Sequence, residues 1–265
     1  MMRIGFIGGG YMGEALVSAF LKAGVVQPDD IVVSDVAEER RKQLSADYGV
    51  RATADNAEAV LNGDVIVLAV KPQEFPNVAA PLKGTLNSGQ TVLSIMAGVP
   101  MERLARELGH SAIVRVMPNT AAFVAEAMSV WTASSAVADE AKRGIAGLLR
   151  AMGRELEVSD ESYLDMATAV SGSGPGFVFY FLEGLIDGAL KVGFEREQAE
   201  ALAVQTLYGA ACLARESDKD AGALREMVTS KGGTTAAGLQ KLDDAGVRDA
   251  MISAVVAAHE RAKEL

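Results

Sequence analysis

The glycine-rich stretch near the start of the chain has the spacing of a dinucleotide-binding turn. Gly8, Gly10 and Gly13 form the pattern G-x-G-x-x-G between an apolar run at residues 4–7 and a helical pattern that begins at Glu14. The first glycine of such a unit permits a tight turn, the second lets the backbone approach a pyrophosphate, and the third allows close packing of helix on strand. Amide groups and the positive end of the helix dipole then face the anion. An ordinary βα turn is the alternative, but Asp35 ends the next apolar run, where an acidic residue usually binds the ribose hydroxyls.

A second unusual stretch, Ser230-Lys231-Gly232-Gly233-Thr234-Thr235, joins two expected helices. Its two glycines and two hydroxyls at the start of a helix can bring free amide groups and the helix dipole to a small anion such as a carboxylate. The same residues also fit a capped turn between helices. The pattern alone leaves both interpretations open.

The composition is that of a globular protein large enough for two domains. The 265 residues are 49% hydrophobic and 23% charged, and the net charge is -10. An acidic chain of this kind argues against a nucleic-acid partner. An anionic cofactor must therefore be held by local amide groups, not by the field of the whole protein.

The cysteine and histidine content predicts a chain without disulfides or a metal. Cys212 is the single cysteine, which fits a reducing compartment, and His110 and His259 have no partners at ligand spacing. No apolar run approaches membrane-spanning length, and the start of the chain leads directly into the first strand. We therefore expect a cytoplasmic protein with no membrane partner.

The first 160 residues alternate between strand and helix patterns, which must position the glycine turn. Strand patterns fall at residues 31–34, 50–52, 64–70, 91–96, 112–117, 128–132 and 155–158. This alternation predicts a Rossmann-like, mostly parallel sheet that binds its ligand at the carboxyl ends of the strands. Asn56 follows one of these strands and is expected to cap the next helix.

From Glu161 onward only helical patterns remain. The sequence therefore predicts an α/β protein with a dinucleotide-binding domain at residues 1–160 and an all-helical domain at residues 161–265. In the expected helix at residues 176–192, Phe177, Phe179, Tyr180 and Phe181 make most of the circumference apolar. A helix of that kind must be buried on several sides, which predicts a homodimer with interlocked helical domains.

The chain resembles the pyrroline-5-carboxylate reductase family from end to end. The matching segments are residues 5–13, 69–72, 97–99, 115–120, 170–175 and 224–235, of which the last, Leu-Arg-Glu-Met-Val-Thr-Ser-Lys-Gly-Gly-Thr-Thr, is the family's signature. The resemblance favours the carboxylate-binding interpretation of the Gly-Gly-Thr-Thr turn.

The resemblance implies hydride transfer from a reduced nicotinamide, NADPH or NADH, to the imine carbon of 1-pyrroline-5-carboxylate. The product is proline, in the last step of its biosynthesis. In similar enzymes the substrate lies between the nucleotide-binding rim of one subunit and the helical domain, dimerisation helices are exchanged, and rings can be built from dimers. Because a protonated imine is already electrophilic, the protein needs mainly to position the ring carbon over the nicotinamide.

The resemblance also implies roles for individual residues. Thr235 would hydrogen-bond the ring nitrogen as the catalytic residue, while Ser230, Gly232, Gly233 and Thr234 would help to bind the carboxylate. The residues expected to line the cofactor are Ile7, Gly8, Gly9, Gly10, Tyr11, Met12, Gly13, Asp35, Asn56, Ala69, Val70, Lys71, Pro72, Ala97, Gly98 and Asn119.

The chain departs from the family pattern near the adenosine ribose. Many relatives carry a small hydroxyl or amide residue at the position of Asp35, whose carboxylate would repel a 2′-phosphate and favour NADH. Arg40 and Arg41 could offset that repulsion, although the charge run at residues 38–42 also fits a solvated helix face. Lys231 stands where many relatives have proline.

Two other functions compete with this interpretation. A β-hydroxyacid dehydrogenase has a similar glycine-rich start, but it needs a lysine, and none follows Gly176 in the turn at residues 177–181. A non-catalytic dinucleotide sensor is the second alternative, although the chain has no basic helix for DNA.

Overall fold

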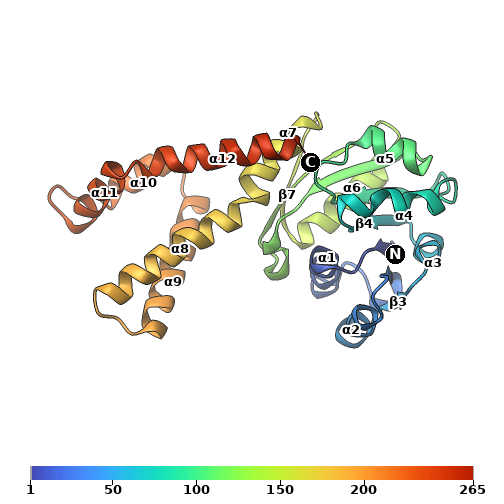
Figure 1. The fold of residues 1–265 in the computed structure, drawn as a ribbon, viewed down its shortest axis with the longest axis horizontal. Coiled ribbons are helices and arrows are strands. Elements are labelled where there is room, and N and C mark those ends of the chain that lie inside the picture. The colour runs from blue at the N-terminus through green and yellow to red at the C-terminus, as the bar shows by residue number, and fades with distance from the viewer. Residues whose placement is uncertain (1, 265) are drawn as a thin grey trace. The chain divides into compact units, whose positions relative to one another are not determined.

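The computed structural model describes residues 2–264, and its centre is one sheet of eight strands in the order β3-β2-β1-β4-β5-β6-β7-β8 (Figure 1). Strands β1 to β6 run parallel to their neighbours, β7 is antiparallel to β6, and β8 is parallel to β7. The predicted mostly parallel, Rossmann-like sheet is confirmed, and β7 and β8 are the two strands that run opposite to β1–β6. The strands are β1 (Ile4–Ile7), β2 (Ile31–Ser34), β3 (Arg51–Thr53), β4 (Val65–Leu68), β5 (Thr91–Ser94), β6 (Ile113–Met117), β7 (Ala127–Ala133) and β8 (Gly153–Glu157).

The central strands are buried on both faces. Every residue of β1, β2, β4, β5 and β6 is buried, as expected for parallel strands that helices cover on both sides. The sheet order reverses between β1, which pairs with β2, and β4, which pairs with β1 on its other edge. Ligands of open parallel sheets bind at this kind of switch point, beyond the carboxyl ends of the strands.

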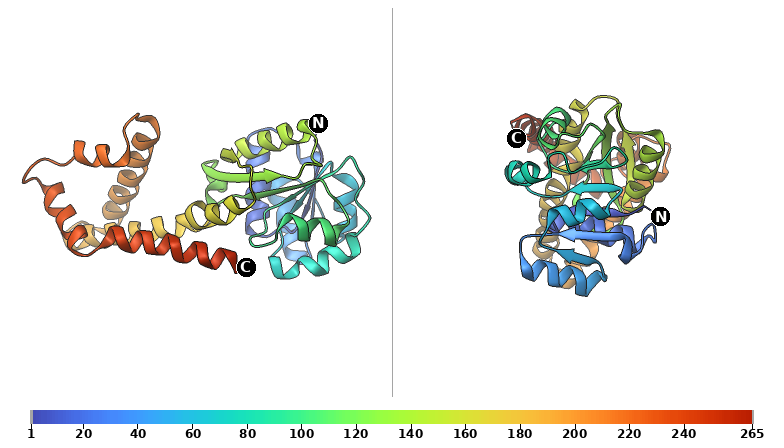
Figure 2. Two further views of the ribbon diagram at one scale, coloured as in Figure 1. Left: turned by 90° about the horizontal axis from the view of Figure 1, so that it is seen from above. Right: turned by 90° about the vertical axis from the view of Figure 1, so that its right-hand side faces the viewer.

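Two layers of helices cover the sheet. One buried cluster contains Phe20 of α1 (Tyr11–Lys22), Leu44 of α2 (Glu38–Tyr48) and Leu149 of α6 (Asp139–Ala151). The other contains side chains of α3 (Asn56–Asn62), α4 (Phe75–Leu82) and α5 (Met101–Leu108). Figure 2 shows α6 and the pair α4–α5 on opposite sides of the strands. Because most of α1 is buried against the sheet, its first turn is held in a fixed position.

After β8 the chain is helical. The elements are α7 (Ser162–Ala167), a wide π-type turn at Thr168–Gly172, α8 (Gly174–Lys191), α9 (Arg196–Glu216), α10 (Ala221–Met227), α11 (Thr234–Asp244) and α12 (Val247–Lys263). Of the helices in residues 2–264, none is long and apolar enough to cross a membrane.

The chain divides into two compact units after Ser173. The first unit runs to Ser173 and also takes the chain from Ala258, whereas the second covers Gly174–Ala257. Helix α7 stays with the sheet because Leu164 packs in a cluster with Met117. Just before α7, Glu161 Oε1 accepts hydrogen bonds from the backbone nitrogen of Met101 at 2.7 Å and from Nη1 of the buried Arg115 at 2.5 Å.

The second unit has almost no core of its own. Helices α8, α10 and α11 bury no residue, and α9 buries only Ala199 and Ala203. Large apolar side chains are exposed instead, including Phe179 at 58% and Tyr180 at 80%. Exposed apolar surface on this scale marks a protein–protein interface.

Candidate active site

The glycine turn after β1 has the geometry that its spacing predicts. Gly8 has a φ of +98°, in the left-handed region, and its nitrogen donates to the carbonyl of Ser34 at 2.9 Å. A Cβ on Gly13 would lie 2.5 Å from the carbonyl oxygen of Gly8, so only glycine lets α1 approach the turn this closely. A Cβ on Gly10 would meet nothing within 4 Å. Gly10 therefore faces open space, where a ligand can approach the backbone.

The start of α1 offers amide groups without partners. Gly10 is the N-cap and gives no side-chain cap, and the first helical bond to the turn is that of Glu14 N to Gly10 O at 2.9 Å. Within residues 2–264, the amides from Gly10 to Gly13 have no acceptor. Free amides at a helix N-terminus are the donors that bind a phosphate group.

Asp35 lies beside the turn and is fixed by backbone amides. Its Oδ2 accepts from Gly9 N at 2.9 Å, and its Oδ1 accepts from Ala37 N at 2.9 Å. Nearby, Arg41 Nη1 donates to the carbonyls of Asp35 at 2.8 Å and of Val36 at 3.0 Å. A carboxylate and a guanidinium thus lie together at the end of β2, where an adenosine ribose binds in this fold.

Arg40 does not belong to a solvated helix face, in contrast to one interpretation of the charge run at residues 38–42. Its side chain is only 20% exposed, and Nη2 lies 2.5 Å from Oε2 of Glu14, whose side chain is 15% exposed. Tyr48 donates its hydroxyl to Oε1 of the same carboxylate at 2.9 Å. Burial alone would raise the pKa of Glu14, but the hydrogen bonds from Arg40 and Tyr48 outweigh burial and lower that pKa. This cluster lies directly against the glycine turn.

Asn56 lies at the rim, but it does not cap its helix. The N-cap of α3 is Asp55, whose side chain accepts from Ala57 N at 2.8 Å, and Asn56 is the first helical residue. The side chain of Asn56 instead pairs with Ser34, whose buried hydroxyl lies 2.7 Å from Oδ1. The expected cap is therefore one residue out, because an aspartate precedes the asparagine and takes that role.

The remaining expected cofactor residues follow neighbouring strands. Ile7 pairs in register with Leu68 at the end of β4, and Leu68 pairs with Ser94 at the end of β5. The residues after these strands, at 69–72 and 97–98, therefore lie along the same edge of the sheet as the glycine turn. Ile7 itself is 1% exposed, so only its backbone can line a ligand site.

The side chain of Asn119 is hydrogen-bonded to two backbone segments. Its Oδ1 accepts from Ala121 N at 3.2 Å, and its Nδ2 donates to Ser171 O at 3.1 Å. The asparagine thereby ties the end of β6 to the π-type turn that leads into α8. Nothing in its sequence context distinguishes this role from contact with a cofactor.

The second glycine turn lies in the helical unit, between α10 and α11. Gly232 has a φ of +74°, and Gly233 is the N-cap of α11 without a side-chain cap. Within residues 2–264, the amides of residues 234–236 have no acceptor, and the Thr235 hydroxyl has no hydrogen-bond partner. The turn is not capped by its own side chains, which leaves its amides available for an anion.

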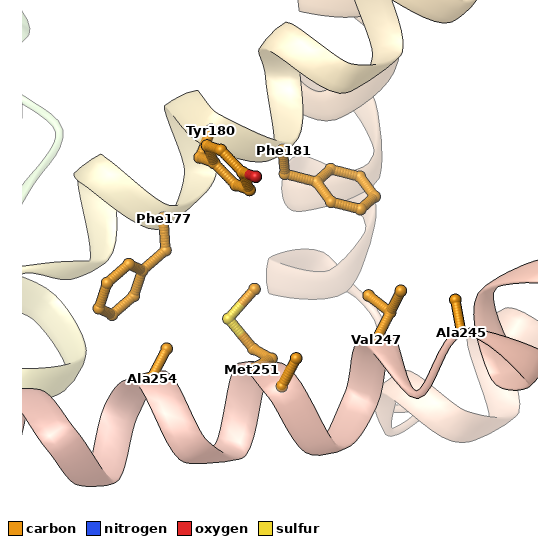
Figure 3. A pocket seen from close by; sticks show the side chains of 8 residues that line it. Phe177, Tyr180, Phe181, Ala245, Val247, Met251 and Ala254 are labelled. Carbon is orange, nitrogen blue, oxygen red and sulfur yellow. The ribbon is translucent and has the colours of Figure 1, made fainter.

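An apolar groove lies between α8 and α12 in the same unit (Figure 3). Phe177, Tyr180 and Phe181 project from α8 toward Met251 and Val247 of α12. The atoms that line the groove are almost all carbon and sulfur, so its surface suits an apolar helix as a partner.

Sequence patterns missed the side chains that support the nucleotide turn. The sequence patterns place Ser34 in a strand and Glu14 in a helix and assign neither a role in the site. In the structure Ser34 hydrogen-bonds Asn56, and Glu14 pairs with Arg40. The residues of these two pairs are 22 and 26 positions apart in the sequence, so no local pattern joins them.

No group of three or more possible metal ligands occurs in the described part of the chain.

Comparisons with known proteins identify the family of the chain. The family model described as pyrroline-5-carboxylate reductase dimerisation matches residues 161–265, and the model described as NADP oxidoreductase coenzyme F420-dependent matches residues 3–98. The pyrroline-5-carboxylate reductase of Methanosarcina acetivorans is 43% identical over 264 residues, which are 99% of this chain and 97% of that protein. The chain belongs to the pyrroline-5-carboxylate reductase family.

Solved structures of family members have the same fold. The pyrroline-5-carboxylate reductase of Coxiella burnetii matches with a TM-score of 0.90 and 36% identity, covering 99% of this chain and 98% of its own. The Plasmodium falciparum enzyme, whose structure has NADP bound, matches with a TM-score of 0.91 and 30% identity, covering 99% and 97%. The family is one of NAD(P)-dependent oxidoreductases. Membership in it, at 43% identity over nearly the whole chain, removes the β-hydroxyacid dehydrogenase alternative.

Proposed function

We propose that this chain reduces 1-pyrroline-5-carboxylate to L-proline with a hydride from NADPH or NADH. The observation that carries the proposal is the presence of two uncapped glycine turns in a member of this reductase family. One has free amides and open space at Gly10, and the other has free amides beside the unpaired hydroxyl of Thr235.

The first turn and its rim would hold the dinucleotide. The amides from Gly10 to Gly13 suit the pyrophosphate, and Asp35 and Asn56 lie where the adenosine ribose would bind. Residues 69–72 and 97–98 extend this rim toward the next strand ends. The reduced nicotinamide, when bound, supplies the hydride.

The second turn would hold the imino acid. The amides of Gly232 and of residues 234–236 would bind the carboxylate, whereas the Gly233 amide donates to Ser230 O at 3.0 Å. The Thr235 hydroxyl would hydrogen-bond the ring nitrogen and fix the imine carbon for attack. One C–H bond forms at the imine carbon, and the electron pair of the C=N bond goes to nitrogen, which keeps its proton. Thr235 orients the ring and does not need to act as a strong base.

The helical residues 161–265 would serve as the dimerisation and substrate-binding domain. We propose a homodimer in which the groove lined by Phe181 and Met251 accepts an apolar helix of a second copy. Such dimers can assemble further into rings. The complete enzyme would act in the cytoplasm.

The choice of coenzyme depends on opposite charges at one place. The Asp35 carboxylate disfavours a 2′-phosphate, whereas the Arg41 guanidinium favours it. Titration of the purified protein with NADH and NADPH in parallel, with 1-pyrroline-5-carboxylate present, measures both activity and preference. Oxidation of neither coenzyme would leave the non-catalytic sensor as the function.

The role of Thr235 can be tested with Thr235→Ala. Loss of one substrate hydrogen bond should lower kcat/KM for the imine by about 10-fold to 100-fold and leave coenzyme affinity nearly unchanged. Thr206→Ala is the matched control, because the Thr206 hydroxyl bonds its own helix at Leu202 O. Equal losses for imine and coenzyme in Thr235→Ala would show that the residue is structural.

A further inference from the structure

We propose that Arg40 is a positioning residue of the nucleotide turn and does not bind the 2′-phosphate of a coenzyme. Through its contacts with the turn carbonyls, Arg40 aims the amides that hold the pyrophosphate. This inference rests on the proposed function, because it concerns the same dinucleotide site.

Most of the guanidinium of Arg40 is engaged within the chain. Nε donates to the carbonyl of Gly9, and Nη2 lies 2.5 Å from Glu14 Oε2 and 3.4 Å from the carbonyl oxygen of Gly10. Nη1 donates to Gln43 Oε1 at 2.8 Å. Four of its five N–H groups therefore have acceptors in the chain, and a phosphate that bound through two parallel hydrogen bonds would have to displace at least one of them.

The contact with Gly9 controls the direction of an amide in the site. All peptide bonds of the described chain are trans, so the carbonyl of Gly9 and the amide of Gly10 point in opposite directions across one peptide plane. With the Gly9 carbonyl held toward Arg40, the Gly10 amide points away from α2. That amide has no acceptor within residues 2–264 and lies beside the open space at Gly10.

Glu14 and Tyr48 hold Arg40 in this position. The Glu14 carboxylate accepts from both side chains, and although burial would raise its pKa, these hydrogen bonds hold that pKa below the ordinary value. Glu14 belongs to the same first turn of α1 that binds Gly10 O through its own amide. Helices α1 and α2 are thus joined around the turn by a closed set of contacts.

Arg41 is the contrasting cation. Only its Nη1 has partners, the carbonyls of Asp35 and Val36, and within residues 2–264 its Nε and Nη2 have none. A 2′-phosphate would therefore meet Arg41 and Asp35, and the two neighbouring arginines have separate functions.

The test measures the Kd of NAD+ and NADP+ by isothermal titration calorimetry for the full-length protein and the variants Arg40→Lys and Arg41→Met. Lysine retains a charge beside Glu14 but cannot reach Gln43 and both carbonyls at once. Arg40→Lys should weaken both nucleotides about 10-fold, with their Kd ratio unchanged within about 2-fold and with Tm close to that of the unmodified protein. Arg41→Met should weaken NADP+ alone.

Three results separate the possibilities. If Arg40→Lys loses NADP+ but keeps NAD+, Arg40 binds the phosphate and the inference is overturned. Unchanged affinity for both nucleotides in that variant also overturns it. If the unmodified protein binds neither nucleotide, the proposed function fails as well, which distinguishes that outcome from failure of the inference alone.

Discussion

The two glycine turns differ in how their own units support them. The turn at residues 8–13 is enclosed by the sheet, α1 and α2, and a Cβ at Gly8 or Gly13 would collide with backbone atoms at 2.7 and 2.5 Å. The turn at residues 230–235 stands in a unit with almost no core, and a Cβ on Gly232 would meet nothing within 4 Å. One site is preorganised within a single chain, whereas the other needs additional surface to enclose a small ligand.

The largest expected effect on coenzyme binding comes from a substitution at Gly10, in the first of the two turns. Gly10→Ala should weaken NAD(P)H binding by about 100-fold, because a methyl group would occupy the space that the pyrophosphate needs. Its φ of -64° suits alanine, so Tm should not fall. Gly147→Ala, in a helix and also without a neighbour within 4 Å, is the control for adding a methyl group. Normal coenzyme binding in Gly10→Ala would contradict the placement of the pyrophosphate.

A charge in the apolar groove should show that the second unit depends on a partner. Phe181→Glu should shift the protein from dimer to monomer in light scattering after gel filtration, with an increase in the dimer Kd of at least about 100-fold. Leu61→Glu, at a side chain that is 76% exposed in the sheet unit, should leave the dimer intact. A dimer that survives Phe181→Glu would place the interface elsewhere.

The open turn can be tested with a pair of glycines. Gly232 and Gly246 both have a left-handed φ, +74° and +65°, and at either position an added methyl group would have no neighbour within 4 Å. Alanine should cost each about 1 kcal/mol of stability. Only Gly232→Ala should also raise KM for the imine, by about 5-fold to 10-fold, because it disturbs the carboxylate amides. An equal rise in both variants would mean that the turn at Gly232 has no special role.

The smallest expected effect concerns the acid side of the stability curve. The folded-state pKa of Glu14 lies below its ordinary value of 4.5, so its contribution is complete above that pH and is lost as the pH falls further below it. Glu14→Gln should lower the free energy of unfolding by about 1 kcal/mol at pH 7 and by less at pH 3. Urea unfolding across this range measures the difference, and Glu197→Gln, at an exposed residue, should show none.

The parts of the fold that local pattern controls could be predicted from the sequence. The continuous apolar run at residues 65–70 contains β4, and the glycine spacing places the turn before α1. The antiparallel direction of β7 could not be predicted, because it depends on pairing with β6 across an intervening loop. The reversed direction of β7, which β8 shares, alters no local pattern.

Only those site residues whose role follows from local sequence could be predicted. The glycines belong to this group, because their backbone geometry follows from their spacing. Asn56 and Asn119 do not, since their partners, Ser34 and Ser171, come from distant parts of the chain. The sequence identifies Arg40 as a cation near the turn, but its ion pair with Glu14 depends on how α1 and α2 pack.

The position of β1 also has a consequence for the order of events during synthesis. Strand β1 leaves the ribosome before both of its neighbours, β2 on one edge and β4 on the other. A nascent chain that ends before Val65 lacks one neighbour of β1, so the glycine turn must wait for residues that are translated much later. Long-range pairing of this kind slows folding, so β1 completes its pairing only after a much later segment has been synthesised.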